Sequence, residues 1–233
     1  MKRILVVEDE YAIRDLLALN LERGGYSVVC AASGERALDI FDQDSEGFDI
    51  VLLDIMLPGI SGFEVCESIR GKNQIVGIIM LSAKTQEADK VTGLAIGADD
   101  YVTKPFSVNE LAARVDAVYR RTANTTPSFR NDGKEIVCGN FTLNFDSRIL
   151  KKNGEPLELT QVEFHIMKYF MENPGRALDR DSILKRVWSE KYHADAKIVD
   201  VNIRRLRMKI EDEPAEPRNI VTVWGYGYRW SNA

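Results

Sequence analysis

The stretch that decides the fold of the first half of this chain is VLLDIMLPG, residues 51–59. It continues an apolar run that begins at Ile50, and a Leu-Pro-Gly sequence then breaks the pattern. A short apolar run bounded by breakers is typical of a strand buried on both faces, as in a parallel sheet. Asp54 stands at the carboxyl end of this strand, which faces the ligand crevice in open α/β sheets. Taken alone, Asp54 is equally compatible with a turn or a helix cap.

Strands and helices alternate five times across the first half of the chain. Short apolar runs predict strands at residues 3–7, 26–30, 50–53, 76–81 and 100–103. Apolar residues at helical spacing predict helices at residues 13–21, 34–41, 62–70, 85–96 and 107–121. This alternation predicts a doubly wound α/β domain with a five-stranded parallel sheet. The order of the strands does not follow from the pattern.

Charged and polar side chains follow four of these strands. The strand ends carry Glu8 and Asp9, Asp54, Ser82 and Lys104. Because parallel strands end at the same edge of a sheet, we expect these side chains to lie close together. Three carboxylates at one edge repel one another and require a cation, and oxygen ligands without His or Cys favour Mg²⁺.

Such a group of side chains is equipped to accept a phosphoryl group. Asp54 would be the nucleophile and would form an aspartyl phosphate. Lys104 and the metal would neutralise the charge on the phosphoryl oxygens. The backbone carbonyl of Met56 offers a further metal oxygen. The bond between Lys104 and Pro105 is a candidate cis peptide that would aim the lysine inward.

Residues 1–122 resemble the receiver domain of bacterial response regulators. The resemblance rests on Glu8-Asp9, on Asp54 within LLDIMLPG, on Ser82-Ala83, and on Tyr101 followed by Thr103-Lys104-Pro105-Phe106. It implies that a histidine kinase phosphorylates Asp54, with Asp9 and Asp54 on the metal and Glu8 nearby. It also implies that Ser82 contacts the phosphoryl group and that Tyr101 turns inward when it does.

Other interpretations of these residues remain open. Ser82 is also compatible with a helix cap, and Tyr101 with a half-buried aromatic residue at a sheet edge. A phosphatase of the haloacid dehalogenase type also uses a strand-end Asp, but it requires a second Asp two residues later, where this chain has Met56. We therefore expect a regulator and not an enzyme.

The last part of the first domain carries an apolar patch surrounded by charges of both signs. The apolar members are Val91, Leu94 and Ala112, and the charged members are Lys90, Asp99, Asp100, Glu110, Arg114 and Arg121. A solvated surface is the usual fate of such charges. The segment resembles the OmpR/PhoB subfamily, which implies a symmetric dimer with Lys90 paired to Glu110, Asp100 to Arg114 and Asp99 to Arg121. A two-fold interface pairs one patch with itself, which suits opposite charges on one face.

A polar linker without periodicity, residues 123–133, separates the first domain from a second, residues 134–233. Short alternating segments between residues 136 and 159 predict a small antiparallel sheet. Thr160 and Glu163 form a capping-box pattern at the start of a helix, and Asp179 is placed to cap a second one. A basic third helix from Lys197 to about residue 211 is followed by a hairpin within residues 220–230.

Three helices, the last one basic, followed by a hairpin are the layout of a winged helix, an α+β helix-turn-helix domain. Basic residues on a helix are usually solvated surface, but this position favours double-stranded DNA, whose major groove admits a helix. Residues 134–233 resemble the effector domain of OmpR/PhoB-type regulators. The resemblance implies that Val201 and Arg205 face bases and that Arg204 and Arg207 face phosphates. The candidate DNA contacts are Lys197, Val201, Arg204, Arg205, Arg207 and Arg229.

One residue departs from the family pattern. Many members carry Arg in the wing, where it enters the minor groove, and this chain has Trp224. Trp224 is unable to make that charged contact, but it is compatible with packing against a sugar or with a place in the core. In proteins of this kind the loop corresponding to residues 189–196 can contact RNA polymerase.

Composition bounds these interpretations. The chain has 233 residues and a net charge of −5, which divides into −7 for residues 1–122 and +2 for the rest. A nucleic-acid interface must therefore come from local clustering of charge. The three Cys, at positions 30, 66 and 138, fit neither a disulfide set nor a zinc site. The apolar runs are too short for a membrane span, and we expect a cytoplasmic protein without a membrane partner.

Together these patterns predict a DNA-binding response regulator. Phosphorylation of Asp54 would favour a homodimer, and the dimer would bring two winged helices onto paired DNA sites and so regulate transcription. The main alternative is a regulator that dimerises independently of phosphorylation. A phosphatase acting through Asp54 and a protein-binding second half are the further alternatives.

Overall fold

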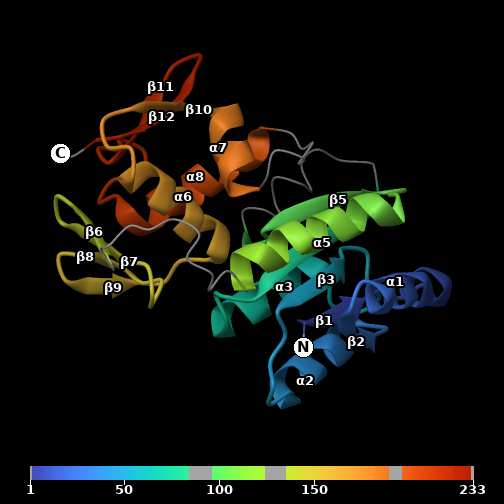
Figure 1. Ribbon diagram of the computed structural model, residues 1–233. Helices are drawn as coiled ribbons and strands as arrows, with labels where there is room; N and C mark the ends of the chain where they lie inside the picture. The colour runs from blue at the N-terminus through green and yellow to red at the C-terminus, as the bar shows by residue number, and fades with distance from the viewer. Residues whose placement is uncertain (1, 84–95, 124–134, 189–195, 232–233) are drawn as a thin grey trace. The chain divides into compact units, whose positions relative to one another are not determined.

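A computed structural model of the chain describes residues 2–83, 96–123, 135–188 and 196–231 (Figure 1), without the side chains of residues 121–123. The chain divides into two compact units, residues 1–123 and 124–233. The linker at 123–133 and most of the helix expected at 85–96 lie outside the described residues. Among the described residues, no helix has the length and apolar character needed to cross a membrane.

The first unit is built on a five-stranded parallel sheet. Its strands are β1 (Lys2–Val7), β2 (Tyr26–Ala31), β3 (Ile50–Asp54), β4 (Gly77–Ala83) and β5 (Asp100–Lys104). They lie in the order β2-β1-β3-β4-β5, and every pairing is parallel. The predicted doubly wound sheet is confirmed. The order reverses direction between β1 and β3, and this switch point is where open α/β sheets form their ligand crevice.

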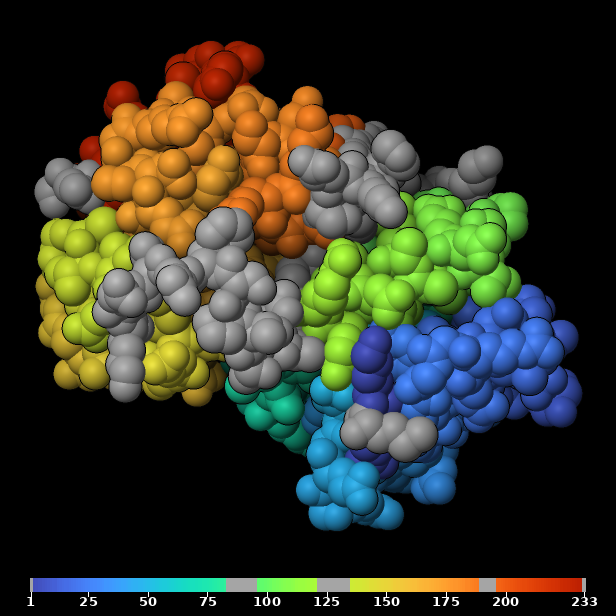
Figure 2. All heavy atoms as spheres, in the orientation of Figure 1, coloured from blue at the N-terminus to red at the C-terminus, as the bar shows by residue number. Residues whose placement is uncertain are grey.

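Helices cover both faces of this sheet. They are α1 (Tyr11–Arg23), α2 (Gly34–Gln43), α3 (Gly62–Lys72) and α5 (Val108–Ala123). In Figures 1 and 2, α1 in blue and α5 in green lie beside each other. Leu17 and Leu21 of α1 join Leu111 and Val115 of α5 in one buried cluster with strand residues. Burial of this apolar surface is the main stabilising contribution to such a unit.

The start of α3 fixes the loop that follows the central strand. Ser61 and Glu64 form a capping box in which each side chain accepts a hydrogen bond from the other residue's backbone N–H. Gly62 lies against the end of β3: a Cβ atom at this position would be 2.0 Å from the carbonyl oxygen of Asp54. Only a residue without a side chain allows the helix to approach the strand end this closely.

Replacing Gly62 with Ala should therefore destabilise the first unit. We expect a loss of about 1–3 kcal/mol in the free energy of unfolding, the usual range for overpacking. Gly71→Ala is the matched control, because Gly71 lies in the same helix and nothing is within 4 Å of its Cβ position. This control should gain about 0.4–1 kcal/mol. Calorimetry of both variants tests the pair, and equal losses would contradict the steric explanation.

The second unit begins with a four-stranded antiparallel sheet. Its strands, in spatial order, are β6 (Glu135–Cys138), β7 (Phe141–Asn144), β8 (Leu150–Lys152) and β9 (Glu155–Leu157). Three helices follow: α6 (Gln161–Met171), α7 (Arg180–Val187) and α8 (Lys197–Ile210). The predicted sheet and the predicted three helices are confirmed. Residues 189–195, most of the expected RNA polymerase loop, lie outside the described residues.

The C-terminal hairpin consists of β11 (Ile220–Val223) and β12 (Gly227–Trp230). A third strand, β10 (Ala177–Asp179), lies just before α7 and pairs with β12. The sequence analysis did not predict this strand. Trp230 lies in the core, with its ring centroid 5.3 Å from that of Phe141. The side chain of Trp224, at the hairpin tip, is 91% exposed. A place in the core is therefore excluded for Trp224.

Candidate functional site

Three carboxylates meet at the carboxyl edge of the parallel sheet. Glu8 and Asp9 follow β1, Asp54 ends the neighbouring strand β3, and one oxygen from each lies within 4.8 Å of the others. Glu8 and Asp54 are buried, whereas Asp9 is exposed. Glu8 Oε1 is buried and has no hydrogen-bond partner among the residues that the structure describes. A buried carboxylate oxygen without a partner, beside two further carboxylates, fits a hard divalent cation such as Mg²⁺.

Lys104 lies between two of these carboxylates. Its Nζ is 2.7 Å from Glu8 Oε2 and 2.6 Å from Asp54 Oδ2. Burial lowers the pKa of Lys104, but hydrogen bonds and charges from Asp54 and Glu8 outweigh burial and raise the pKa above its usual value. The ammonium group is therefore held charged next to the reactive carboxylate. The peptide bond between Lys104 and Pro105 is cis, as the sequence analysis suggested.

Burial shifts the pKa of Glu8 in the opposite direction from that of Lys104. Burial raises the pKa of this carboxyl group, and the hydrogen bond from Lys104 offsets only part of the rise. The charge of Asp54 raises the pKa further. Three carboxylates face one lysine at this edge, and their mutual repulsion favours binding of a cation.

Arg14 supports the acidic pair in a way that the sequence analysis missed. Its Nη1 donates hydrogen bonds to the backbone carbonyl oxygens of Glu8, at 2.6 Å, and Asp9, at 3.0 Å. These bonds fix the backbone between β1 and α1, from which both carboxylates project. No motif marks this residue, because a basic residue on an amphipathic helix is usually solvated.

Of the remaining receiver residues, Ser82 and Met56 lie near or just beyond strand ends, whereas Tyr101 lies near the start of β5. Ser82 is buried near the end of β4, opposite Thr103 of β5. Tyr101 is 9% exposed, so its ring is turned into the protein although β5 is an edge strand. Met56 donates its backbone N–H to Asp54 Oδ1 at 3.2 Å, and its side chain is exposed. The expected role of the Met56 carbonyl oxygen as a metal ligand stays a prediction.

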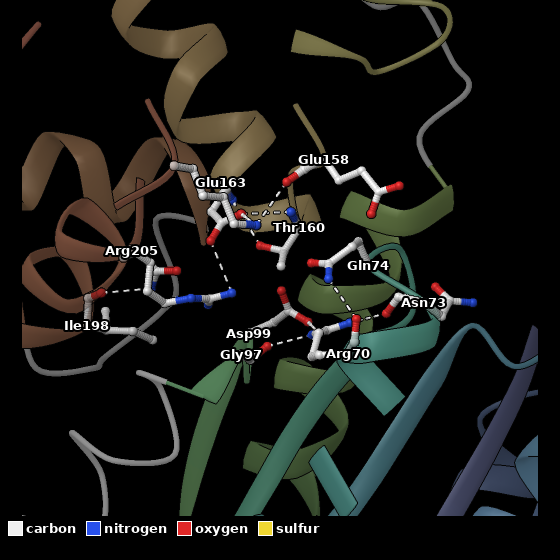
Figure 3. Close-up of polar contacts among 12 residues, drawn as sticks. Arg70, Asn73, Gln74, Gly97, Asp99, Glu158, Thr160, Glu163, Ile198 and Arg205 are labelled. Carbon is white, nitrogen blue, oxygen red and sulfur yellow. Dashed lines mark hydrogen bonds and ion pairs between the residues drawn. The ribbon is translucent and has the colours of Figure 1, made fainter. Parts of the chain in front are cut away.

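Asp99 and Asp100 are not surface charges in this structure. Asp99 is 1% exposed, and its Oδ2 lies 2.6 Å from Arg70 Nη2 (Figure 3). Arg70 also donates to the carbonyl oxygens of Gly97 and Val76, at 2.7 and 2.6 Å. The pair therefore joins the end of α3 to the residues that precede β4 and β5. Arg70 was not predicted, because its partners are distant in sequence.

The charged face of α5 forms pairs within the same chain. Arg114 lies 2.9 Å from Glu110 and 3.4 Å from Asp100, which is fully buried. Ala112 is exposed on this helix. Lys90, Val91 and Leu94, and the side chain of Arg121, lie outside the described part of the chain.

In the second unit a buried carboxylate joins α6 to α8. Glu163 is fully buried, and the predicted capping box with Thr160 is confirmed. Its Oε1 lies 3.0 Å from Arg205 Nη2, and its Oε2 lies 2.7 Å from Lys209 Nζ. Figure 3 shows Arg205 of α8 directed toward Glu163. Burial raises the pKa of Glu163, but the charges of Arg205 and Lys209 outweigh it, so the pKa lies below its usual value.

Arg207 connects α8 to the hairpin. Its guanidinium group donates to the carbonyl oxygen of Ile220 at 2.6 and 2.9 Å and to the hydroxyl of Thr222 at 2.9 Å. Burial lowers the pKa of Arg207 below its usual value. The guanidinium group of Arg207 is therefore engaged in hydrogen bonds within the second unit.

Comparison with known proteins agrees with both units. Residues 4–116 match the family described as "Response regulator receiver domain", and residues 154–230 match "Transcriptional regulatory protein, C terminal". The chain is 44% identical over 229 residues to the sensory transduction protein RegX3 of Mycolicibacterium smegmatis, covering 98% of this chain and 99% of the relative. The chain belongs to the response regulators with an OmpR/PhoB-type DNA-binding domain. Its predicted family is thereby confirmed.

Solved structures of similar proteins show the same architecture. A mutant of RitR matches over 100% of both chains with a TM-score of 0.78 and 25% identity. DrrB, an OmpR/PhoB homologue from Thermotoga maritima, matches over 99% of both chains with a TM-score of 0.52 and 32% identity. The α/β receiver followed by a winged-helix DNA-binding domain is therefore the fold of this response regulator.

Several residues of the predicted contact set also have partners within this chain, and their expected roles at DNA or in a dimer stay predictions. Arg205, expected at bases, is the partner of buried Glu163, and Arg207, expected at phosphates, holds the hairpin. Asp99, expected to pair with Arg121 of a second copy, pairs with Arg70 of its own chain. The helical pattern identifies which side chains lie off the apolar stripe, but it does not reveal a buried partner on another element. Among the expected DNA contacts, Lys197, Arg204 and Arg229 are exposed, whereas Val201, Arg205 and Arg207 are half-buried.

The Glu163 cluster should make the second unit acid-sensitive. Because the folded-state pKa of Glu163 lies below its unfolded value, its contribution to stability is present above about pH 4.3 and is lost as pH falls through the folded pKa. Glu163→Gln should lose about 3–5 kcal/mol at pH 7, since Arg205 and Lys209 would lose their buried partner. The stability of the Glu163→Gln variant should also depend less on pH in the acidic range than that of the wild type.

Tryptophan emission measures this prediction in the intact chain, because all three Trp residues lie in the second unit. Glu158→Gln is the matched control: this side chain is exposed, and only its backbone carbonyl accepts from Lys209. The control should unfold like the wild type. Equal pH dependence of the Glu163 variant and the wild type would contradict the assignment.

Proposed function

We propose that this response regulator is phosphorylated on Asp54 by a histidine kinase, dimerises through its receiver and then binds promoter DNA to regulate transcription. The observation that carries the proposal is the position of Lys104 Nζ, 2.6 Å from Asp54 Oδ2 at the edge of the sheet that also holds Glu8 and Asp9. A carboxylate with a fixed cation beside it is prepared to attack phosphorus, because the developing charge is already matched. We place this activity in the cytoplasm.

In the proposed reaction an oxygen of Asp54 attacks the phosphorus of a phosphohistidine. The new O–P bond forms as the P–N bond breaks, and the electron pair of that bond stays on the imidazole nitrogen. Lys104 would hold its positive charge beside the phosphoryl oxygens, and Ser82 would donate a hydrogen bond to one of them. Arg14 holds the backbone of the acidic pair in position.

A divalent cation completes the proposed site. Glu8, Asp9, Asp54 and the backbone carbonyl of Met56 would hold Mg²⁺, which neutralises charge on the phosphoryl oxygens when bound. Glu8 Oε1, which has no hydrogen-bond partner within the described ranges, supports this assignment.

Phosphorylation has a direct test. Acetyl phosphate with Mg²⁺ should add one phosphoryl group to the wild type, and Asp54→Asn should add none. Intact-mass spectrometry measures the adduct, and removal of Mg²⁺ with a chelator should abolish it. Asp42→Asn, which alters an exposed pair with Lys72, should retain the adduct. An adduct on Asp54→Asn would place the phosphoacceptor elsewhere, and its absence from every protein would favour a phosphorylation-independent regulator or strict dependence on a kinase.

Dimerisation is proposed to involve the face of α5 that carries Glu110 and Arg114. Ala113 lies three residues after Glu110 and shares this face, whereas Ala112, the apolar member that the sequence analysis expected, lies two residues from each and points to another side of the helix. The phosphorylated protein should sediment as a dimer. Ala113→Arg should prevent dimerisation without changing phosphorylation, because a long charged side chain would lie in the symmetric contact. Ala112→Arg places the same side chain at an exposed position outside this face and should dimerise. Sedimentation velocity distinguishes the two variants, and a dimer of Ala113→Arg would exclude this face.

The expected contact with RNA polymerase through residues 189–196 stays a prediction.

A further inference from the structure

The tip of the C-terminal hairpin presents a large aromatic side chain to solvent. Trp224 is 91% exposed, whereas Trp188 and Trp230 are each 1% exposed. Its neighbour Tyr226 is 49% exposed. Single exposed apolar residues are common on proteins and need no explanation by themselves. The way in which this tip is attached to α8 gives Trp224 its significance.

The base of the hairpin is held to the C-terminal part of α8 through one residue. The backbone N–H of Ile220 donates to Glu211 Oε1 at 2.8 Å, and its carbonyl oxygen accepts from Arg207 Nη2 at 2.6 Å. Arg207 belongs to α8, and Glu211 is the residue that follows its last turn. Glu211 also accepts hydrogen bonds from the backbone N–H groups of Arg218 and Asn219. Side chains at this end of α8 thus hold both backbone groups of Ile220.

A second attachment joins the hairpin to the first turn of α8. The hydroxyl of Tyr228 in β12 donates to Asp200 Oδ1 at 2.7 Å, and Arg180 Nε donates to the same oxygen at 2.7 Å. Burial together with the carboxylate of Asp200 raises the pKa of Tyr228 to about 12, so this hydroxyl remains a donor at neutral pH. The hairpin is therefore attached near both ends of α8.

The tip itself is short and tightly turned. Tyr226 donates its backbone N–H to the carbonyl oxygen of Val223 at 3.0 Å, and Gly225 has a φ of 71°. Gly227 lies so close to β10 that a Cβ atom would be 2.0 Å from the carbonyl oxygen of Leu178. The hydrogen-bonded turn and the close approach to β10 both hold the tip, and its position relative to α8 is fixed.

We propose that Trp224 packs against the deoxyribose backbone of bound duplex DNA, beside the groove that receives α8, and contributes affinity without charge. This inference rests on the proposed function. DNA is the favoured occupant because the tip is attached to α8 and because exposed Arg204 and Arg229 provide positive charge on α8 and on the same hairpin. A flat apolar ring excludes water from the carbon atoms of a sugar, but it releases no counterion.

Because the indole ring of Trp224 carries no charge, its contact with DNA should not depend on salt concentration. Each neutralised phosphate contributes about −0.9 to the slope of log K against log salt concentration. Trp224→Ala should therefore weaken DNA binding by about tenfold at every salt concentration and leave the slope unchanged. Arg204→Ala should weaken binding and also flatten the slope. Trp224→Phe should retain most of the affinity, because it keeps an apolar ring.

The test uses the full chain, phosphorylated with acetyl phosphate and Mg²⁺, and a duplex that the protein enriches from a random-sequence pool. Fluorescence anisotropy of the labelled duplex gives affinity at several salt concentrations. Acrylamide, an uncharged quencher, reports exposure of Trp224, because the other two Trp residues are buried. Saturating duplex should protect the wild type from quenching. Thermal unfolding of Trp224→Ala should match the wild type, since the lost side chain is exposed.

The outcomes separate this inference from the proposed function. Duplex binding by anisotropy with unchanged quenching, or with wild-type affinity for Trp224→Ala, would overturn the Trp224 contact and leave DNA binding intact. A flatter salt slope for Trp224→Ala would also overturn it, because the contact would then depend on charge. Failure to enrich or bind any duplex at low salt would overturn the DNA-binding role itself.

Discussion

The ammonium group of Lys104 lies between two carboxylates that the parallel sheet has removed from water, Glu8 and Asp54. Uncompensated buried charge is strongly unfavourable, so a cation must remain at this edge of the sheet. The same requirement gives Glu163 its partners Arg205 and Lys209 in the second unit, and Asp99 its partner Arg70 in the first. In the receiver three carboxylates face one lysine, which leaves the site able to bind a metal. In the second unit the carboxylate is fully matched by positive charge, and the cluster joins two helices.

The difference between these clusters explains how one chain supports two kinds of site. At the acidic edge of the receiver, Asp9 is open to solvent and Glu8 Oε1 lacks a partner among the described residues, so the arrangement is prepared for further ligands. In the Glu163 cluster each carboxylate oxygen is paired with a positive group, Oε1 with Arg205 and Oε2 with Lys209. Its arginine is a positioning residue for α8.

The sequence predicted the parallel sheet and the meeting of Glu8, Asp9, Asp54 and Lys104 because both follow from local patterns. Apolar runs identify the strands, and parallel strands bring their ends to one edge. The roles of Arg70 and Arg205 could not be predicted in this way. Each pairs with a carboxylate on a distant element, and the helical pattern of either arginine is the same whether it is solvated or buried. Strand β10 was missed because three residues next to a helix cap carry no periodic signal.

The order of the strands has a consequence for how the receiver opens. The carboxylates belong to the inner strands β1 and β3, whereas Lys104 belongs to β5, which lies at the sheet edge. Edge strands open before inner strands do, because they are hydrogen-bonded on one side only. Opening of β5 would withdraw the lysine and leave the carboxylates facing one another, so their repulsion holds this edge strand in place. A divalent cation bound between the carboxylates would remove that repulsion, and amide hydrogens along β5 would then exchange faster in the metal-bound protein than in the metal-free one.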